Sequence, residues 1–309
     1  MLEIIRGAVS LGLLWAVMTI GVYITYRILN IADLTVEGSI ALGAAIAAQI
    51  ISKGTNPYIA TGVSILGGMA AGLVTGILHT VLKIPALLSG ILTMIALYSV
   101  NLRVLGKASL SLLRMETVYT VFERMGLESS WSVIMLGLIV VALVICLLYW
   151  FFGTELGCAI RATGNNPEMV RAQGINTNTM IILGLVISNG LVAFSGALIA
   201  QNQSFADVQM GTGSIVIGLA SVIIGEVLFG KRNFMMRLIS IALGAITYRI
   251  IIAFVLKLGM HSNDLKLFTA ITVAIALSLP IIRNRINPPR ISIEESEQQA
   301  QNLNGGKNA

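Results

Sequence analysis

The sequence of 309 residues contains little charge, little cysteine and little histidine. Only 11% of its residues are charged, against about 25% in a soluble domain, which excludes a soluble domain of ordinary composition. The two cysteines, Cys146 and Cys158, lie in an apolar run and in the polar stretch after it, so no disulfide is expected between them. The two histidines, His79 and His261, are isolated from each other, which argues against a metal cluster.

Catalytic motifs are also missing from the chain. The one near match to a nucleotide-binding loop runs from Gly225 to Arg232, and it places Arg232 where a Ser or Thr must ligate magnesium. This segment also ends an apolar run instead of joining a strand to a helix. We therefore predict that the chain is not an enzyme and binds no cofactor or metal of its own.

Apolar sequence is what the chain has in abundance. Hydrophobic residues make up 56% of it and its mean hydropathy is +0.88. Runs of roughly 17–25 apolar residues can cross a bilayer as helices, so we predict an all-α fold, a polytopic transmembrane helical bundle of about 8–9 spans. The predicted spans, several of them short, are Val9–Ile28, Ser39–Ile51, Ile59–Val81, Ala86–Val100, Trp131–Phe152, Met180–Ala200, Ile215–Leu228, Leu238–Leu256 and Phe268–Ile282.

The positions of Lys and Arg in short loops predict the orientation, because cytoplasmic loops carry an excess of both. The basic positions that mark the cytoplasmic side are Lys83, Arg161, Arg171, Lys231, Arg232, Arg237, Arg283, Arg285 and Arg290. Successive groups are separated by two predicted spans, which places the C-terminus in the cytoplasm and the N-terminus outside. This pattern, with attraction to lipid headgroups, accounts for the net charge of +6, and no nucleic-acid partner is expected. We expect a transmembrane domain over residues 1–283, with a large loop at 154–178, and a disordered cytoplasmic tail over 284–309.

Charged residues inside or beside the spans are costly and are therefore candidates for function. Asp33 and Glu37 lie where a helix is interrupted before a short span. Either they belong to a substrate site with free backbone N–H groups, or they cap the second span, and both can hold. Arg249 lies deep in its span and meets either a substrate carboxylate or an internal partner. We expect the internal ion pair, whose candidate partners are Asp33, Glu226 and Asp207.

The sixth span carries two further polar candidates, Asn189 and Gln201. They are expected to form interhelical hydrogen bonds or, as the alternative, to contact a ligand. Residues 189–201 also align without gaps with residues 37–49, sharing a Gly, three Ala and the final Gln. Such small residues let helix backbones approach closely, and transporters often bind their substrates between structural repeats.

The polar stretch from Thr154 to Asn178 lies between two long apolar runs and has a helical pattern of its own. We predict a short helix, a turn over residues 164–167 and a second helix that Gly174 ends. The apolar residues are expected to form one adhesive face, and the polar ones to face a partner or lipid. These are Leu156, Ile160, Met169 and Val170 on the first face, and Arg161, Asn165, Asn166 and Arg171 on the second. A docking element for a cytoplasmic protein is favoured over an idle interfacial hairpin.

Three segments carry a resemblance to a known family. Residues 154–176 resemble the cytoplasmic loop of ABC importer permeases of the branched-chain amino acid, ribose and nucleoside superfamily, which has an Arg-Ala-x-Gly-x-Asn run and then an Ala-x-x-x-Gly-Ile-Asn run. Residues 33–38 are similar to the Asp-Leu-Ser-Val-Gly stretch of the sugar branch, and residues 189–198 fit the span after the loop. The resemblance covers most of residues 10–283 and is closest to the tryptophan/tyrosine-type subgroup.

The resemblance implies a permease subunit in a bacterial cell membrane, which forms the translocation path with a second copy, as a homodimer. A cytoplasmic ABC ATPase subunit would bind the ATP and dock on the loop, and an extracytoplasmic solute-binding protein would deliver the substrate. The residues that match the docking part of the loop are Arg161, Ala162, Thr163, Gly164, Asn165 and Asn166, followed by Ala172, Gly174, Ile175 and Asn176. On this basis Gly164→Asp is predicted to abolish docking without unfolding the chain.

The substrate is expected to be a small polar solute, an amino acid of aromatic or branched-chain type. Asp33 matches the Asp of the sugar-branch motif, but Glu37 stands where that branch has Gly. A negative charge together with Arg249 suits a zwitterion better than a neutral sugar. The expected substrate pathway comprises Asp33, Glu37, Asn189, Gln201 and Arg249. The alternatives are a secondary transporter that is coupled to protons through Asp33 or Glu37, a permease for a sugar or nucleoside, and a membrane protein without transport.

Overall fold

The computed structural model describes residues 2–124, 126, 128–230, 233–257, 267, 269–271, 273, 274 and 278. Most of the ninth predicted span and the whole predicted tail lie outside these residues. The helical elements are α1 Leu2–Tyr23, η1 Ile24–Ile28, α2 Thr35–Ser52, α3 Pro57–Thr80, α4 Ala86–Leu105, α5 Thr120–Arg124, α6 Ser129–Phe152, α7 Glu155–Asn165, α8 Pro167–Ala172, α9 Thr177–Gln203, α10 Ser214–Phe229 and α11 Phe234–Lys257. Two short strands, β1 Ser109–Ser111 and β2 Phe205–Asp207, pair antiparallel.

The all-α membrane fold predicted from the sequence is confirmed. Seven helices among the described residues are long and apolar enough to cross a bilayer, and α10 is a shorter apolar helix of 16 residues. Helices are the outcome because a backbone surrounded by lipid must satisfy its hydrogen bonds internally. Each of the first eight predicted spans overlaps one of these helices, but α1 begins seven residues before the predicted Val9 and α4 ends five residues after the predicted Val100. The chain is therefore a multi-pass membrane protein.

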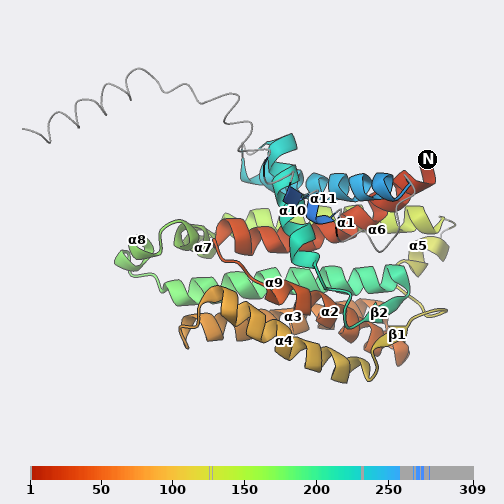
Figure 1. Cartoon of the computed structure of the whole chain (residues 1–309), viewed down its shortest axis with the longest axis horizontal. Helices are drawn as coiled ribbons and strands as arrows, with labels where there is room; N and C mark the ends of the chain where they lie inside the picture. Colours follow the sequence, from red (N-terminus) through yellow and green to blue (C-terminus); the bar gives the residue numbers. More distant parts are fainter. Residues whose placement is uncertain are drawn as a thin grey trace, which may run out of the picture.

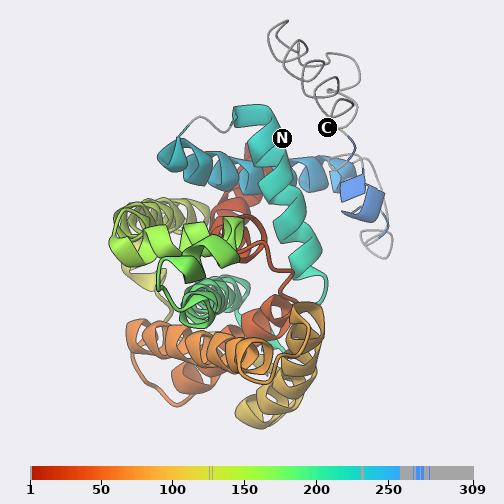
Figure 2. The ribbon, with the colours of Figure 1, turned by 90° about the vertical axis from the view of Figure 1, so that its left-hand side faces the viewer.

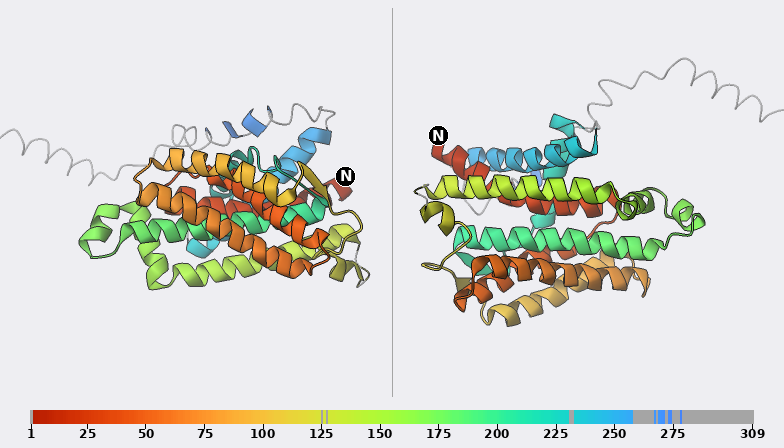
Figure 3. Two further views of the ribbon diagram at one scale, coloured as in Figure 1. Left: turned by 90° about the horizontal axis from the view of Figure 1, so that it is seen from below. Right: turned by 180° about the vertical axis from the view of Figure 1, so that it is seen from behind.

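The bundle has two distinct ends (Figure 1). Helices α7 and α8 project at one end, and β1, β2, α5 and the N-terminus lie at the other. The same separation is seen from below and from behind (Figure 3). The N-terminus thus lies opposite the 154–178 loop, as the charge pattern predicted.

Helices α2, α3 and α9 form the closely packed centre of the protein. A Cβ on Gly43 would meet the backbone of Ala193, and one on Gly196 would meet the backbone of Ile40, so α2 and α9 cross at glycine. Gly68 of α3 packs in the same way on Asn189. Seen from the α7/α8 end, α9 runs through the middle of the bundle beside α3, while α10 crosses the other helices at a steep angle (Figure 2). The two segments that align in the sequence are therefore in direct contact.

The first span is interrupted before α2 begins. Helix α1 ends in the π-helical turn η1, and Asn30 has a positive φ of 56°, which ends the regular helix. Residues 29–34 then lead to Thr35, the first residue of α2. Asp33, in this segment, contacts Asn189, which lies about 18 Å along α9 from the α7/α8 end at 1.5 Å per residue. This break between η1 and α2, residues 29–34, therefore reaches the interior of the bundle.

Candidate functional site

The polar loop folds as two helices, as predicted, but the predicted turn over residues 164–167 is reduced to Asn166, because α7 continues to Asn165 and α8 begins at Pro167. The Thr154 hydroxyl accepts a hydrogen bond from Gly157 N at 3.4 Å at the start of α7, and the Asn166 side chain accepts one from Met169 N at 3.1 Å at the start of α8. Pro167 is the first residue of α8, and Gly174 follows the helix with a φ of 82°, a conformation that favours glycine. The chain thus forms two short capped helices at one end of the bundle.

The hairpin has a buried inner side and an exposed outer side. Ile160 and Val170 are fully buried against the bundle, whereas Leu156 and Met169 are 51% and 46% exposed. The prediction of one common apolar face is therefore wrong, because only two of the four apolar residues anchor the hairpin. The four polar residues that were predicted to face a partner or lipid are all exposed, namely Arg161, Asn165, Asn166 and Arg171. An outer surface of mixed apolar and polar character can bind a protein partner.

Gly164 packs directly on the end of the first span. A Cβ at this position would meet the carbonyl oxygen of Ile28 and approach the Cα atom of Leu29. Thr163, beside it, is buried and its hydroxyl donates to Ala159 O at 2.7 Å. The Gly164→Asp prediction needs correction, because a side chain here would meet Ile28 and disturb the packing of α7. Gly164 joins the hairpin mechanically to the break before α2.

Asp33 and Asn189 form a buried hydrogen-bond network at the break. Asp33 Oδ2 accepts from Asn189 Nδ2 at 2.8 Å, and Asp33 Oδ1 accepts from Thr35 N at 2.9 Å. Asn189 Oδ1 in turn accepts from the Ser39 hydroxyl at 2.7 Å. Both Asp33 and Asn189 are at most 2% exposed. Asp33 thus caps the start of α2, as one of the two sequence interpretations held, and Asn189 forms the predicted interhelical hydrogen bonds.

Glu37 lies apart from this network and faces a cavity. Its Oε1 atom accepts from Gly213 N at 2.9 Å, so the carboxylate caps the start of α10. Glu37 also lines a cavity of about 410 Å³ between α2, α4 and the segment that leads to α10. Of the five residues expected in the substrate pathway, Glu37 is the one that lines this cavity.

Gln201 anchors the end of the bundle that carries the N-terminus. Its Oε1 atom accepts from Val118 N at 3.0 Å and its Nε2 atom donates to the Thr61 hydroxyl at 2.9 Å. The Tyr119 hydroxyl donates to Leu198 O at 3.0 Å, and burial raises the pKa of this hydroxyl, which keeps it protonated. Gln201 therefore holds the loop after β1 against α3 and α9.

Arg249 does not form the predicted ion pair with any of the three candidates. Its guanidinium group lies over the Trp15 ring, 4.1 Å from the ring centroid. Glu226 pairs with Arg27 at 2.7 Å, while Asp33 and Asp207 accept from Asn189 and from Gln209 N respectively. The ion pair does not form because the three carboxylates are engaged elsewhere, and the face of the Trp15 ring attracts the cation instead. Arg249 does not line the cavity of Glu37.

One ion pair and one residue of a cavity wall were not foreseen from the sequence. Arg27 and Glu226 join η1 to α10, and the Glu226 side chain is only 5% exposed. Asn101 of α4 is 1% exposed and lines the same cavity as Glu37. The fourth span was predicted to end at Val100, so Asn101 lay outside it, whereas α4 continues to Leu105. The signal that could have found it is a polar residue within one turn of a span end.

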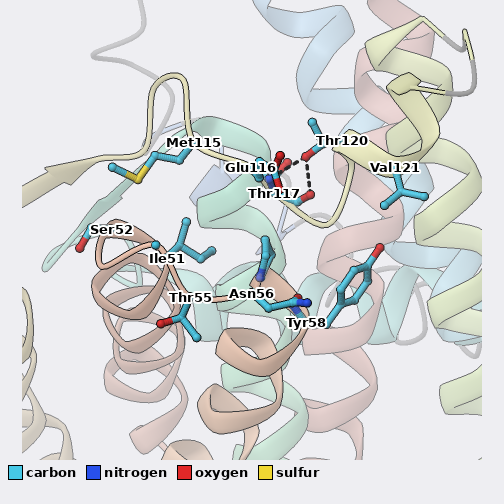
Figure 4. A pocket seen from close by; sticks show the side chains of 12 residues that line it. Ile51, Ser52, Thr55, Asn56, Tyr58, Met115, Glu116, Thr117, Thr120 and Val121 are labelled. Carbon is cyan, nitrogen blue, oxygen red and sulfur yellow. Dashed lines mark hydrogen bonds between the residues drawn. The ribbon is translucent and has the colours of Figure 1, made fainter.

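A second cavity opens at the end opposite the hairpin (Figure 4). Its lining comes from the end of α2, the start of α3 and residues 115–121. Thr117 N donates to the Thr120 hydroxyl at 2.7 Å and orders one wall of this cavity. The cavity measures about 610 Å³ and presents polar groups that a soluble partner could contact.

The sequence of this chain is similar to that of known proteins. Residues 4–279 match the family described as the permease component of the branched-chain amino acid transport system. The chain belongs to this permease family. This is a family of transport proteins, so transport across a membrane is the coarse function of the chain.

The relatives of this permease include amino-acid and sugar transporters. It is 44% identical over 269 residues to the tyrosine transport system permease protein of Clostridioides difficile, covering 87% of this chain and 88% of the relative. It is 32% identical over 283 residues to an uncharacterized protein of Rickettsia prowazekii, covering 90% and 98%. The ribose import permease protein of Escherichia coli is more distant, at 24% identity over 263 residues and 85% and 80% coverage. No solved structure matches the chain.

Proposed function

We propose that this permease is the membrane subunit of an ATP-driven bacterial importer of an amino acid of aromatic or branched-chain type. Two copies form the translocation path, a cytoplasmic ATPase docks on the α7–α8 hairpin, and an extracytoplasmic solute-binding protein delivers the substrate to the opposite end. The family match and the 44% identity to a tyrosine transport permease support the amino-acid substrate. ATP is bound by the partner subunit, and this chain carries out no covalent chemistry.

One observation carries the coupling part of this proposal, namely the contact between the hairpin and the broken first span. The outer side of the hairpin exposes Arg161, Asn165 and Asn166 to a partner. Its inner side places Gly164 against Ile28, at the start of the break. A force on the hairpin therefore reaches the segment that positions Asp33 and α2. In this mechanism the ATPase moves the hairpin, and the break allows α2 to follow without unfolding a continuous helix.

The proton-coupled alternative receives less support from the site. Asp33 is buried, accepts hydrogen bonds from Thr35 N and Asn189, and lines none of the cavities described above. A carboxylate that carries protons across a membrane needs access to water on both sides in turn. Glu37 faces a cavity, but it caps α10 with one oxygen. These contacts favour a structural role for Asp33 and for the Glu37 oxygen that accepts from Gly213 N.

The docking step can be tested by affinity purification of the tagged chain from its native membrane in mild detergent. We expect an ATPase subunit to co-purify with the wild-type chain and to be lost from Asn165→Glu, whose residue is exposed on the hairpin. The matched control is Gln203→Glu, an exposed residue at the far end of α9, which should retain the ATPase. Recovery of the chain alone under gentle conditions, or equal recovery of the ATPase with both variants, would contradict the proposal.

A further inference from the structure

The cavity beside Glu37 has the chemistry of a ligand-binding site. It lies between the first turn of α2, residues 94–101 of α4 and the segment between β2 and α10. Its volume of about 410 Å³ falls within the range of roughly 300–1,000 Å³ that is typical of small-molecule sites. The site could therefore hold one amino acid. What it would recognise depends on the polar groups of its wall.

Asn101 supplies a buried hydrogen-bond acceptor that has no partner. Its Nδ2 atom donates to Gly38 O at 3.2 Å, which fixes the orientation of the amide, because the opposite orientation would set two oxygens against each other. The Oδ1 atom forms no hydrogen bond with any described residue, and the side chain is 1% exposed. A buried carbonyl without a donor is costly, and such groups are rare in native proteins. A donor is therefore expected at this position.

Glu37 supplies a second acceptor, which carries negative charge. Its carboxylate accepts one hydrogen bond, from Gly213 N, which leaves lone pairs for further donors. Within the described part of the chain, no Lys or Arg lies within ion-pair distance of it. The cavity wall also contains no basic residue. The Glu37 carboxylate therefore gives the cavity a negative charge, and the buried Asn101 carbonyl beside it becomes a second acceptor once a small shift of side chains opens it to the cavity. The two together favour a cation that donates hydrogen bonds.

The rest of the wall suits an apolar side chain. Ile95 and Tyr98 of α4 are 60% and 50% exposed and line the cavity together with Met94. Gln209 and Thr212 lie on the side toward α10 and add polar groups. A primary ammonium group attached to an apolar or aromatic body matches this combination, whereas a neutral sugar would leave the carboxylate without a counter-charge.

We propose that this cavity binds the ammonium group of the transported amino acid, with the Glu37 carboxylate and the Asn101 side-chain carbonyl as its acceptors. The amino-acid side chain lies against Tyr98 and its neighbours on α4. The inference rests on the proposed function for the origin of the ligand, but the cavity and its acceptors are independent of any partner subunit. Asn101 becomes a specificity-determining residue for substrates that carry a free amino group.

The test measures ligand protection of a cysteine placed in the cavity wall. The purified complex would carry Cys146→Ala and Cys158→Ser, and then Thr212→Cys, an exposed residue of the lining. The rate of alkylation by N-ethylmaleimide is measured with tyrosine, with tyramine, which keeps the ammonium group, and with 4-hydroxyphenylpropionate, which lacks it. Tyrosine and tyramine should slow the reaction several-fold and the deaminated acid should not. Gln203→Cys, outside the cavity, serves as the unprotected control.

The acceptors are tested in the same assay with substitutions of similar size. Asn101→Leu and Glu37→Gln should each raise the tyrosine concentration needed for half-protection by about tenfold or more, as expected for a lost hydrogen bond to a charged group. Asn202→Leu on α9 is the matched control and should leave it unchanged. If Asn101→Leu fails to insert into the membrane, Asn101→Ala takes its place.

Several results would overturn the inference. They are equal protection by the deaminated acid, protection that survives both acceptor variants, and protection by ribose but not by tyrosine. Ammonium-dependent protection in a chain that recruits no ATPase would contradict the proposed function and leave the binding site intact. Tyrosine uptake by the complex without any protection would contradict the binding site and leave the proposed function intact.

Discussion

Asp33 and Glu37 lie four residues apart, and their surroundings give them different tasks. Asp33 is enclosed by donors from Thr35 and Asn189, whereas Glu37 has one donor from the chain and faces a cavity. Because burial of a charge is tolerated only with hydrogen-bond partners, Asp33 depends on Asn189. Asp33 is thus a structural carboxylate, whereas Glu37 is placed to contact a ligand.

The dependence of Asp33 on Asn189 predicts a loss of stability in Asn189→Leu. This change removes one donor to Asp33 and the acceptor of the Ser39 hydroxyl, and should cost roughly 2–4 kcal/mol. The expected result is a lower midpoint of thermal unfolding in detergent, followed by loss of monodisperse protein on heating. Asn202→Leu, on the same helix, should change the midpoint little. An unchanged midpoint in Asn189→Leu would mean that the network contributes nothing to the fold.

At the scale of elements, the contact of α7 with the break before α2 joins the proposed ATPase-docking hairpin to the segment that positions α2. Ile160 and Val170 are buried and hold the hairpin to the bundle, so a movement of the hairpin also moves the helices that pack against it. Gly164 brings its backbone against Ile28, where any larger residue would separate the two elements. The Arg27 and Glu226 pair ties the same region to α10.

This contact predicts that Gly164→Ala uncouples ATP hydrolysis from transport. The added methyl group pushes α7 away from Ile28, and Asn165 and Asn166 move with the helix but remain exposed on its outer side. We expect the ATPase to co-purify at the wild-type level while substrate uptake per ATP hydrolysed falls several-fold in proteoliposomes, because movement of the hairpin no longer reaches α2. Gly62→Ala is the control, because a Cβ there meets nothing within 4 Å. Unchanged uptake per ATP in Gly164→Ala would show that force takes another route.

At the scale of the whole molecule, the two ends of the bundle face opposite sides of the membrane. The α7/α8 end contains Lys83 and the hairpin arginines, and the other end contains the α2–α3 turn with Lys53. The cavity of Figure 4 lies at that other end, where a solute-binding protein is proposed to dock. Orientation therefore decides which partner can reach which surface.

The orientation predicts the sidedness of chemical labelling in intact cells. In a chain without its native cysteines, Lys53→Cys should react with a membrane-impermeant maleimide added outside. Lys83→Cys should react only after the membrane has been permeabilised. The two positions are matched, since each replaces a lysine in a short turn between spans. The reverse pattern would place the hairpin outside and remove the basis for ATPase docking.

The apolar runs, the loop hairpin and the family were determined by the sequence alone, because each depends on local composition and spacing. Runs of span length can satisfy their backbones in lipid only as helices, and Pro167 and Gly174 delimit α8 from within the loop. The local signals of the hairpin therefore predicted its two helices, but not which of its apolar residues would be buried.

The tertiary structure alone decided which polar residues meet. The contact of Asp33 with Asn189 joins residues 156 positions apart, and the Arg27 and Glu226 pair joins residues 199 positions apart. Such contacts depend on how each helix is rotated about its axis and on which helix packs beside it. The sequence of a single helix does not determine either. For the same reason Arg249 lies over Trp15 instead of pairing with a carboxylate, and Asn101 joins Glu37 at one cavity.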